Sequence, residues 1–168
     1  MSKAPSEMQL AIGVYIALKF VTTKRQIWNL LSGSGKSRII PAYGVQLLAL
    51  DMARRVHVLI PGAGLLKRDR HEYGDYWELA GYESSVQYHD TTRFEIKQGD
   101  VVLVDEADYF AFSEPVAFGI LLGHLPTICF TGTSPDAHLN ELEDDVLKKM
   151  GLVSHTYWPR CIEAPAKP

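Results

Sequence analysis

The chain has 168 residues, of which 46% are hydrophobic and 22% charged, a composition typical of a globular domain with a sizeable core. Its formal net charge of −3 excludes an overall electrostatic attraction to nucleic acid or to an anionic membrane, although a local basic surface would not show in this sum. Two cysteines, apolar stretches well short of about 20 residues and the lack of a signal-peptide pattern predict a soluble intracellular protein without a membrane span, cytoplasmic by default.

Helical and strand patterns alternate along the chain, which predicts an α/β fold with a mostly parallel sheet and helices on both faces. In chain order we expect a helix over 8–20, a strand over 26–31, a helix over 37–52, a strand over 56–60, a helix over 65–80 capped by Gly81, strands over 85–89 and 101–104, a helix over 114–122, a strand over 127–130 and a helix over 135–150. We expect one domain over residues 1–158 and a Pro-rich tail or linker over 159–168.

A Gly/Ser-rich turn connects the first expected strand to the second expected helix. Glycines let the main chain wrap a phosphate closely, and the amides at a helix N-terminus favour an anion. A lysine in this turn reaches the β- and γ-phosphates, and the hydroxyl after it ligates Mg²⁺. The match is partial because Leu30 stands where the general pattern has its first glycine, and an ordinary turn is the alternative. The predicted phosphate-binding residues are Ser32, Gly33, Ser34, Gly35, Lys36, Ser37 and Arg38.

Two adjacent carboxylates follow the apolar strand expected over residues 101–104. Ligands of open parallel sheets gather at the carboxyl ends of the strands. Asp105 is placed to hold Mg²⁺, and Glu106 is placed to orient and deprotonate the attacking water. The alternative is an acidic turn that caps a helix starting near Tyr109. Because Lys36 lies about 70 residues upstream, the pattern favours a nucleotide site in which Lys36 and Glu106 are catalytic.

A third short motif, formed by Thr131, Gly132 and Thr133, follows the last expected strand. Its hydroxyls would lie beside the acidic turn if the two strands are neighbours. Taken alone, this motif is more typical of an ordinary turn.

Together these motifs resemble the first motor domain of superfamily-two helicases and translocases, including the DEAD-box group, and more closely SecA, the preprotein translocase ATPase. The SecA-like stretches are Gln9-Leu10 before an apolar helix, residues 65–69 and 79–82 after the second strand, and residues 130–133 and 150–152. The resemblance covers roughly residues 8 to 155. It implies a RecA-like P-loop domain that binds ATP and Mg²⁺, with Gln9 at the adenine.

The chain also departs from SecA. Only about 25 residues separate Asp105 from Thr131, which leaves no room for the preprotein-binding insertion. The second motor domain and its arginine finger are missing. We therefore expect a weak or partner-dependent ATPase, with a second RecA-like domain supplied in cis or trans and with polypeptide or nucleic acid as its polymer. The alternatives are a nucleotide-binding regulatory or scaffold module without hydrolysis, and a small P-loop kinase, for which no Arg-rich lid segment is evident.

Several other residues favour structural roles over functional ones. Lys67, Arg68 and Arg70 are more typical of a solvated helix face than of a polymer-binding surface. Tyr73 and Trp77 are expected to pack in the core, and the histidines show no metal-ligand spacing.

Overall fold

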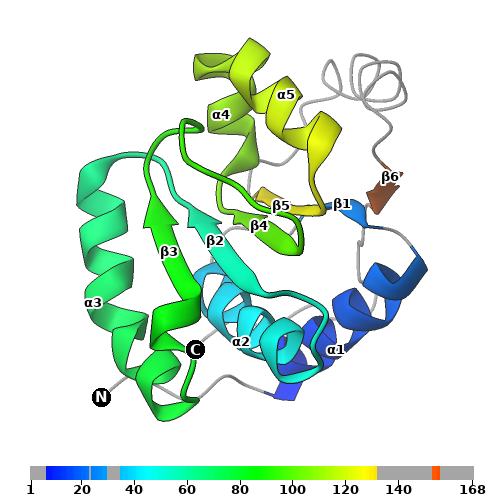
Figure 1. Ribbon diagram of the computed structural model, residues 1–168, viewed down its shortest axis with the longest axis vertical. Helices are drawn as coiled ribbons and strands as arrows, with labels where there is room; N and C mark the ends of the chain where they lie inside the picture. The colour runs from blue at the N-terminus through cyan, green and yellow to red at the C-terminus, as the bar shows by residue number, and fades with distance from the viewer. Residues whose placement is uncertain (1–6, 23, 30–34, 132–152, 156–168) are drawn as a thin grey trace, which may run out of the picture.

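The computed structural model describes residues 7–22, 24–29, 35–131 and 153–155 (Figure 1). The helices are α1 (Glu7–Thr22), α2 (Lys36–Ala49), α3 (Ala63–Leu79), α4 (Ala107–Ser113) and α5 (Pro115–His124), with a short 3-10 turn, η1 (Glu83–Ser85). The strands are β1 (Arg25–Asn29), β2 (Arg55–Leu59), β3 (Val86–His89), β4 (Asp100–Val104), β5 (Thr127–Thr131) and β6 (Val153–His155).

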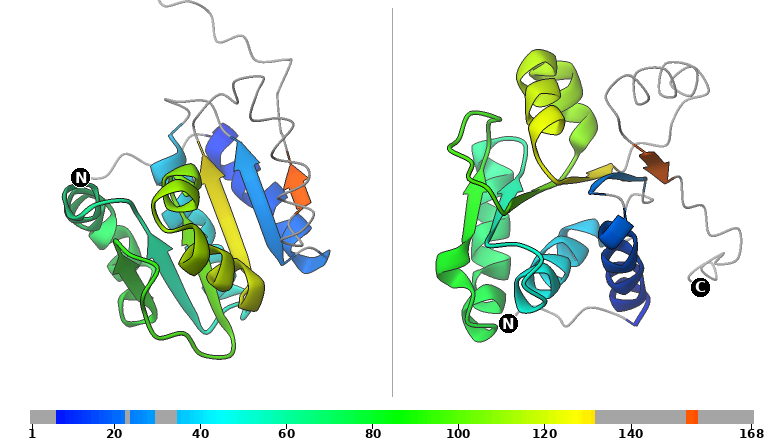
Figure 2. Two further views of the ribbon diagram at one scale, coloured as in Figure 1. Left: turned by 90° about the horizontal axis from the view of Figure 1, so that it is seen from above. Right: turned by 45° about the vertical axis from the view of Figure 1, so that its right-hand side comes forward.

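These strands form one parallel sheet in the order β3-β2-β4-β5-β1-β6. The helices α1, α2 and α3 cover one face of the sheet, and α4 and α5 cover the other (Figure 2). The predicted α/β fold, with a parallel sheet and helices on both faces, is therefore confirmed. Because β5 lies between β1 and β4, the segments that follow these three strands meet at one edge of the sheet.

Each face of the sheet has its own hydrophobic core. The core under α1, α2 and α3 contains Ile16, Tyr43 and Trp77, and the core under α4 and α5 contains Phe110 and Phe118. Strand β4 is buried along its whole length, as expected of an apolar strand in the middle of a parallel sheet. Cys129 is buried. The side chains of Tyr73 and Trp77 are buried as well, which confirms the packing roles predicted for these two aromatic residues.

Pro41 lies inside α2, deeper than the first turn, and its side chain is buried. It removes the helical hydrogen bond that an amide at this position would donate to the carbonyl of Ser37, so α2 tolerates a local defect close to its N-terminus. Gly81 has φ 77° and follows α3, which confirms the left-handed cap.

Three elements differ from expectation. Helix α2 ends at Ala49, a few residues early; α4 is a separate short helix that begins immediately after the acid pair; and β6 is a strand that the sequence did not predict. The helix expected over 135–150 and the tail expected over 159–168 lie outside the described residues.

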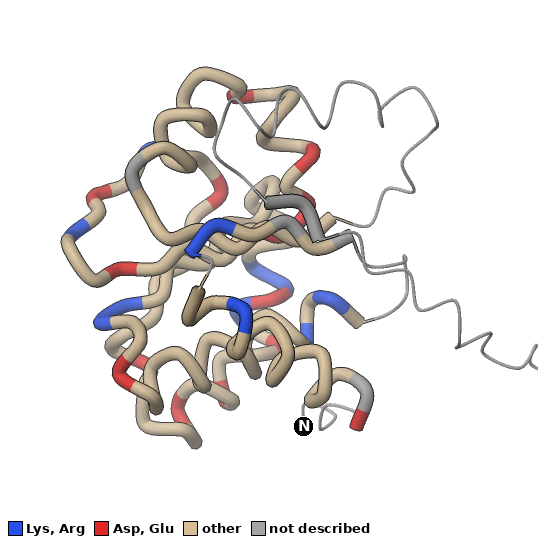
Figure 3. Tube along the Cα trace, turned by 90° about the vertical axis from the view of Figure 1, so that its right-hand side faces the viewer, with Lys and Arg blue, Asp and Glu red and all other residues tan. Residues whose placement is uncertain are grey.

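Basic and acidic residues are interspersed along the described trace (Figure 3), in keeping with the small net charge. Within the described ranges, none of the helices has the length and apolar character needed to cross a bilayer.

Candidate functional site

A cavity of about 510 Å³ lies at the carboxyl edge of the sheet, between α2, α3 and the segment after β4. Seven residues predicted for the site line it: Gln9, Gly35, Lys36, Ser37, Arg38, Asp105 and Glu106. The remaining lining residues are Ile60, Leu65, Arg68, Glu72 and Tyr73. The fold therefore brings together the helix start and the acid pair, which are about 70 residues apart in the sequence.

Gly35 is the residue immediately before α2, at its N-cap position. Its φ of 82° lies in the left-handed region, and a Cβ at this position would collide with the side-chain amide of Gln9. The Gly35 carbonyl accepts hydrogen bonds from the main-chain N–H groups of Arg38 and Ile39, at 2.9 and 3.3 Å. The first amides of α2 are thereby placed beside the cavity, where a helix N-terminus favours an anion.

Lys36 and Glu106 form an ion pair across the cavity, with 3.2 Å between Nζ and Oε1. The Lys36 side chain is only 9% exposed, whereas that of Glu106 is 40% exposed. Glu106 also has φ 47°, a left-handed backbone that is uncommon for a residue with a side chain. The pair neutralises a nearly buried ammonium, and a phosphate in the cavity could compete with Glu106 for it.

Asp105 is the more deeply buried of the two acids. The Ser37 hydroxyl lies 3.5 Å from Asp105 Oδ2, and the main-chain N–H of Glu106 donates to Asp105 Oδ1 at 3.0 Å. The pKa of Asp105 is raised to about 6, chiefly by burial and also by the neighbouring Glu106, while Lys36 opposes the shift.

The Ser37 hydroxyl and the Asp105 carboxylate are close enough to ligate one cation together. Mg²⁺ usually takes one or two carboxylates, water and substrate phosphates rather than a cage of protein ligands. Across the described residues, no cluster of three or more His, Cys, Asp or Glu side chains could hold a metal by itself. The donor set at Ser37 and Asp105 thus fits a magnesium ion that arrives with a phosphate ligand.

Helix α3 adds residues that the sequence assigned to other roles. Arg68 donates from Nε and Nη2 to Asp69 Oδ1, at 2.8 and 2.6 Å, and the buried Asp69 fixes the guanidinium beside the cavity. Arg38 hydrogen-bonds Tyr73, whose pKa is raised chiefly by burial. Leu65, Arg68 and Glu72 follow a helical i, i+3, i+7 spacing, and this pattern could have identified them as one face.

Thr131, the described residue of the third motif, lies beside the acidic segment. Strand β5 pairs with β4, and the Thr131 hydroxyl donates to Asp108 Oδ1 at 3.1 Å. Thr131 does not contribute to the described lining of the cavity. The remaining predicted site residues lie outside the described ranges: Ser32, Gly33, Ser34, Gly132 and Thr133.

Comparison with known proteins bears on the fold. No protein-family model matches the chain, and no curated protein matches it. The structure is similar to the SWI2/SNF2 ATPase core of Sulfolobus solfataricus in complex with dsDNA, with a TM-score of 0.62, 11% identity, and coverage of 96% of this chain and 46% of that one. It is also similar to the UvsW helicase from bacteriophage T4, with a TM-score of 0.60, 12% identity, and coverage of 91% of this chain and 61% of that one.

These similarities show a shared RecA-like fold of the kind found in those helicase and ATPase cores. The chain spans less than two thirds of the length of either structure.

Proposed function

We propose that this chain is an ATP- and Mg²⁺-binding domain of the helicase and translocase type, which hydrolyses ATP weakly or only with a partner. The observation that carries the proposal is the single cavity shared by the start of α2 and the acid pair after β4. The SecA-like stretches and the fold shared with two motor cores support it. Protein translocation itself is not part of the proposal, because the chain has no room for the preprotein-binding insertion.

In this proposal the Lys36–Glu106 ion pair opens when nucleotide binds. The nearly buried Lys36 ammonium turns to the β- and γ-phosphates, which carry more negative charge than one carboxylate. Glu106 is then free to orient a water and accept its proton, which is the general-base role. The loop residues Ser32, Gly33, Ser34 and Gly35 supply main-chain amides to the phosphates.

Ser37 and Asp105 are the residues that would hold Mg²⁺. When bound, this ion would neutralise charge on the phosphates. A cation beside Asp105 favours its ionised form, which offsets the cost of burying the carboxylate. A bound Mg²⁺ would therefore stabilise the close approach of the Ser37 hydroxyl and the Asp105 carboxylate, which lie 3.5 Å apart at the end of the buried strand β4.

Three more polar residues at the cavity have roles in the proposal. Gln9 would hydrogen-bond the adenine, while Arg38 and Arg68 would add positive charge near the phosphates. Thr131, with Gly132 and Thr133, would couple the acidic segment to a neighbouring domain through the bond from Thr131 to Asp108.

The proposed partner is a second RecA-like domain, in cis or in trans. Such a domain would supply an arginine finger, whose loss costs about 10³–10⁵ in rate. Its polymer in this proposal is polypeptide or nucleic acid, and the hydrolysis test with each polymer distinguishes the two; dsDNA is the ligand of the SWI2/SNF2 structure.

The test measures binding of a fluorescent ATP analogue, with and without Mg²⁺, and then ATP hydrolysis with RNA, DNA or unfolded polypeptide. We expect Lys36→Ala to weaken binding by at least about tenfold, which corresponds to about 1.4 kcal/mol. Lys67→Ala is the matched control, because Lys67 is an exposed lysine outside the cavity. Glu106→Gln should bind nucleotide and lose any turnover.

Unchanged binding by Lys36→Ala would refute the proposed site. Binding without turnover, with or without each polymer, would instead support the non-hydrolysing regulatory or scaffold module.

A further inference from the structure

Strand β3 is an edge strand of the described sheet. It pairs with β2 on one side only, and the Ile60 N–H donates to the His89 carbonyl at 2.9 Å. Because successive residues of a strand alternate, His89 and Gln87 direct their main-chain groups toward β2. The N–H and C=O of Tyr88 and the C=O of Val86 therefore face the outer edge.

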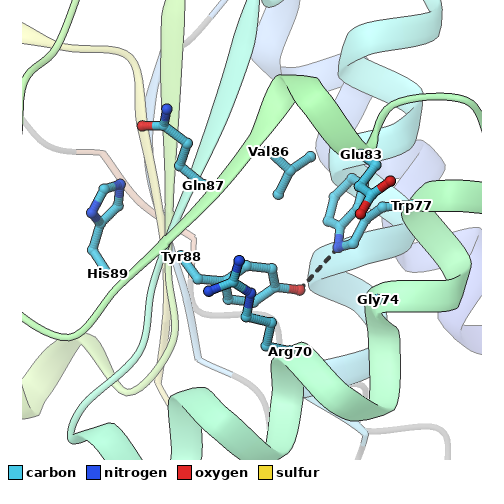
Figure 4. A pocket seen from close by; sticks show the side chains of 8 residues that line it. All are labelled: Arg70, Gly74, Trp77, Glu83, Val86, Gln87, Tyr88 and His89. Carbon is cyan, nitrogen blue, oxygen red and sulfur yellow. Dashed lines mark hydrogen bonds between the residues drawn. The ribbon is translucent and has the colours of Figure 1, made fainter.

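A groove of about 400 Å³ runs along this edge, between β3 and α3 (Figure 4). All four residues of β3 line it, together with Arg70, Gly74, Trp77 and Glu83. Adjacent strand residues point to opposite faces of a sheet, so a groove that touches all four must lie along the strand edge rather than over one face. The outward main-chain groups of β3 are thus accessible from the groove.

The two walls of the groove, α3 and β3, are held together by a side-chain hydrogen bond and leave open space between them. Trp77 Nε1 donates to the Tyr88 hydroxyl at 2.9 Å, which holds α3 against β3. Gly74 sits in the middle of α3, and a Cβ there would meet nothing within 4 Å. A glycine inside a helix costs about 1 kcal/mol relative to alanine. Here it keeps the groove open.

The charges of the groove lie at its two ends. Figure 4 places Arg70 beside Tyr88 and Glu83 beside Trp77, and Gly74 lies between Arg70 and Trp77 in the sequence of α3. Neither Arg70 nor Glu83 forms an ion pair or hydrogen bond with a described side chain. One cation balanced by one anion does not make the positive channel that single-stranded nucleic acid requires.

We propose that this groove binds an extended polypeptide segment, which adds to the sheet beside β3. Main-chain hydrogen bonds from the outer edge supply affinity, as in β-augmentation. On the α3 side, the segment presents an apolar residue over Gly74, an acidic residue toward Arg70 and a basic residue toward Glu83. This interaction goes beyond nucleotide binding and does not depend on it.

The probes are two fluorescent peptides with the cores Glu-Thr-Val-Thr-Lys and Lys-Thr-Val-Thr-Glu, which place the three recognised side chains on one face. The two orders suit the antiparallel and the parallel direction of pairing. Fluorescence polarisation measures their affinity for the parent chain, Gly74→Leu and Gly64→Leu. Gly64 lies on the same helix with equally open surroundings but outside the groove, so it is a matched control.

We expect at least one peptide to bind, Gly74→Leu to weaken it by about tenfold or more, and Gly64→Leu to leave it unchanged. Hydrogen exchange at the Tyr88 amide should slow when the peptide is added to the parent. A peptide in which proline replaces the valine and both threonines should not bind, because proline cannot donate the edge hydrogen bonds in either direction of pairing.

The proposal is overturned if neither peptide binds at millimolar concentration, or if Gly74→Leu and Gly64→Leu behave alike. Displacement of the peptide by single-stranded RNA would assign the groove to nucleic acid instead. Each result is obtained without nucleotide, so it stands apart from the test of the ATP site.

Discussion

Gly35 combines two constraints in one residue. Its backbone is left-handed, and its missing side chain leaves the space that the Gln9 amide occupies. A non-glycine residue in this backbone region costs about 1–2 kcal/mol before any collision is counted. The start of α2 and the position of Gln9 are therefore determined together.

We predict that Gly35→Ala weakens nucleotide binding by at least about tenfold, because the turn must shift away from the phosphate position. Adding Gln9→Ala removes the collision but not the backbone strain, so the double variant should fold better than Gly35→Ala alone. Thermal unfolding and analogue binding measure both effects. Gly64→Ala, at a helical position with open surroundings, is the control. Equal binding by Gly35→Ala and the parent would contradict this account.

Helix α3 lines both the cavity and the groove and also packs against α2. One side lines the cavity through Leu65, Arg68 and Glu72, and another lines the groove through Arg70 and Gly74. Toward α2 it packs its Trp77 ring against Gly44, where a Cβ would collide with the indole. Gly44 of α2 and Gly74 of α3 thus have opposite roles, since Gly44 permits close packing and Gly74 leaves open space.

The same substitution should have opposite signs at these two glycines. Gly44→Ala should lower the free energy of unfolding by about 1–3 kcal/mol, because the core between α2 and α3 would be overpacked. Gly74→Ala should raise it by up to about 1 kcal/mol through helix propensity alone. Chemical denaturation of both variants measures the difference. Changes of the same sign in the free energy of unfolding of the two variants would contradict the close α2–α3 packing at Gly44 or the open space at Gly74.

The sequence predicted the elements whose signal is local and missed those set by tertiary contacts. The apolar runs of β2, β4 and β5 identify buried parallel strands, and Gly81 marks the end of α3. Strand β6 has three residues, and among the described strands it pairs with β1 alone, so its local signal is weak. The polar residues of α3 resemble a solvated face, because a sequence does not show that Arg68 is held by buried Asp69 beside a cavity.

At the scale of the whole molecule, a buried polar cluster joins three strands of the sheet. His57 Nδ1 lies 3.0 Å from His89 Nε2, and His57 Nε2 lies 3.1 Å from Asp100 Oδ2. Arg55 donates two hydrogen bonds to Asp100, and the Phe94 ring stacks on both imidazoles. Burial is the main cause that lowers the pKa of His57, and it lowers the pKa of His89 to about 4.

This cluster predicts a loss of global stability in mild acid. An unfolded histidine takes up its proton near pH 6.5, well before folded His89 does, so the free energy of unfolding should fall as the pH drops from about 6.5 to about 4. Asp105 acts in the opposite direction, because its folded pKa is raised to about 6 and protonation there favours the folded state. The difference in the free energy of unfolding between the parent and a His89→Gln variant therefore isolates the contribution of His89 protonation.

Denaturation of the parent and His89→Gln between pH 4 and pH 7.5 tests this prediction. The variant should lose less stability across that window than the parent, because it carries one fewer histidine that binds a proton only after unfolding. His71→Gln, at an exposed position, should behave as the parent. Parallel pH profiles for the parent and His89→Gln would contradict the assignment.

Because one helix forms a wall of both the cavity and the groove, the two sites can be coupled thermodynamically. If a bound segment displaces α3, and with it Arg68 and Tyr73 at the cavity, nucleotide affinity changes by some factor. Linkage then requires that nucleotide change the affinity for the segment by the same factor. A rigid helix transmits such a displacement without a hinge. In that case α3 would transmit the occupancy of the β3 edge to the residues that bind the phosphates.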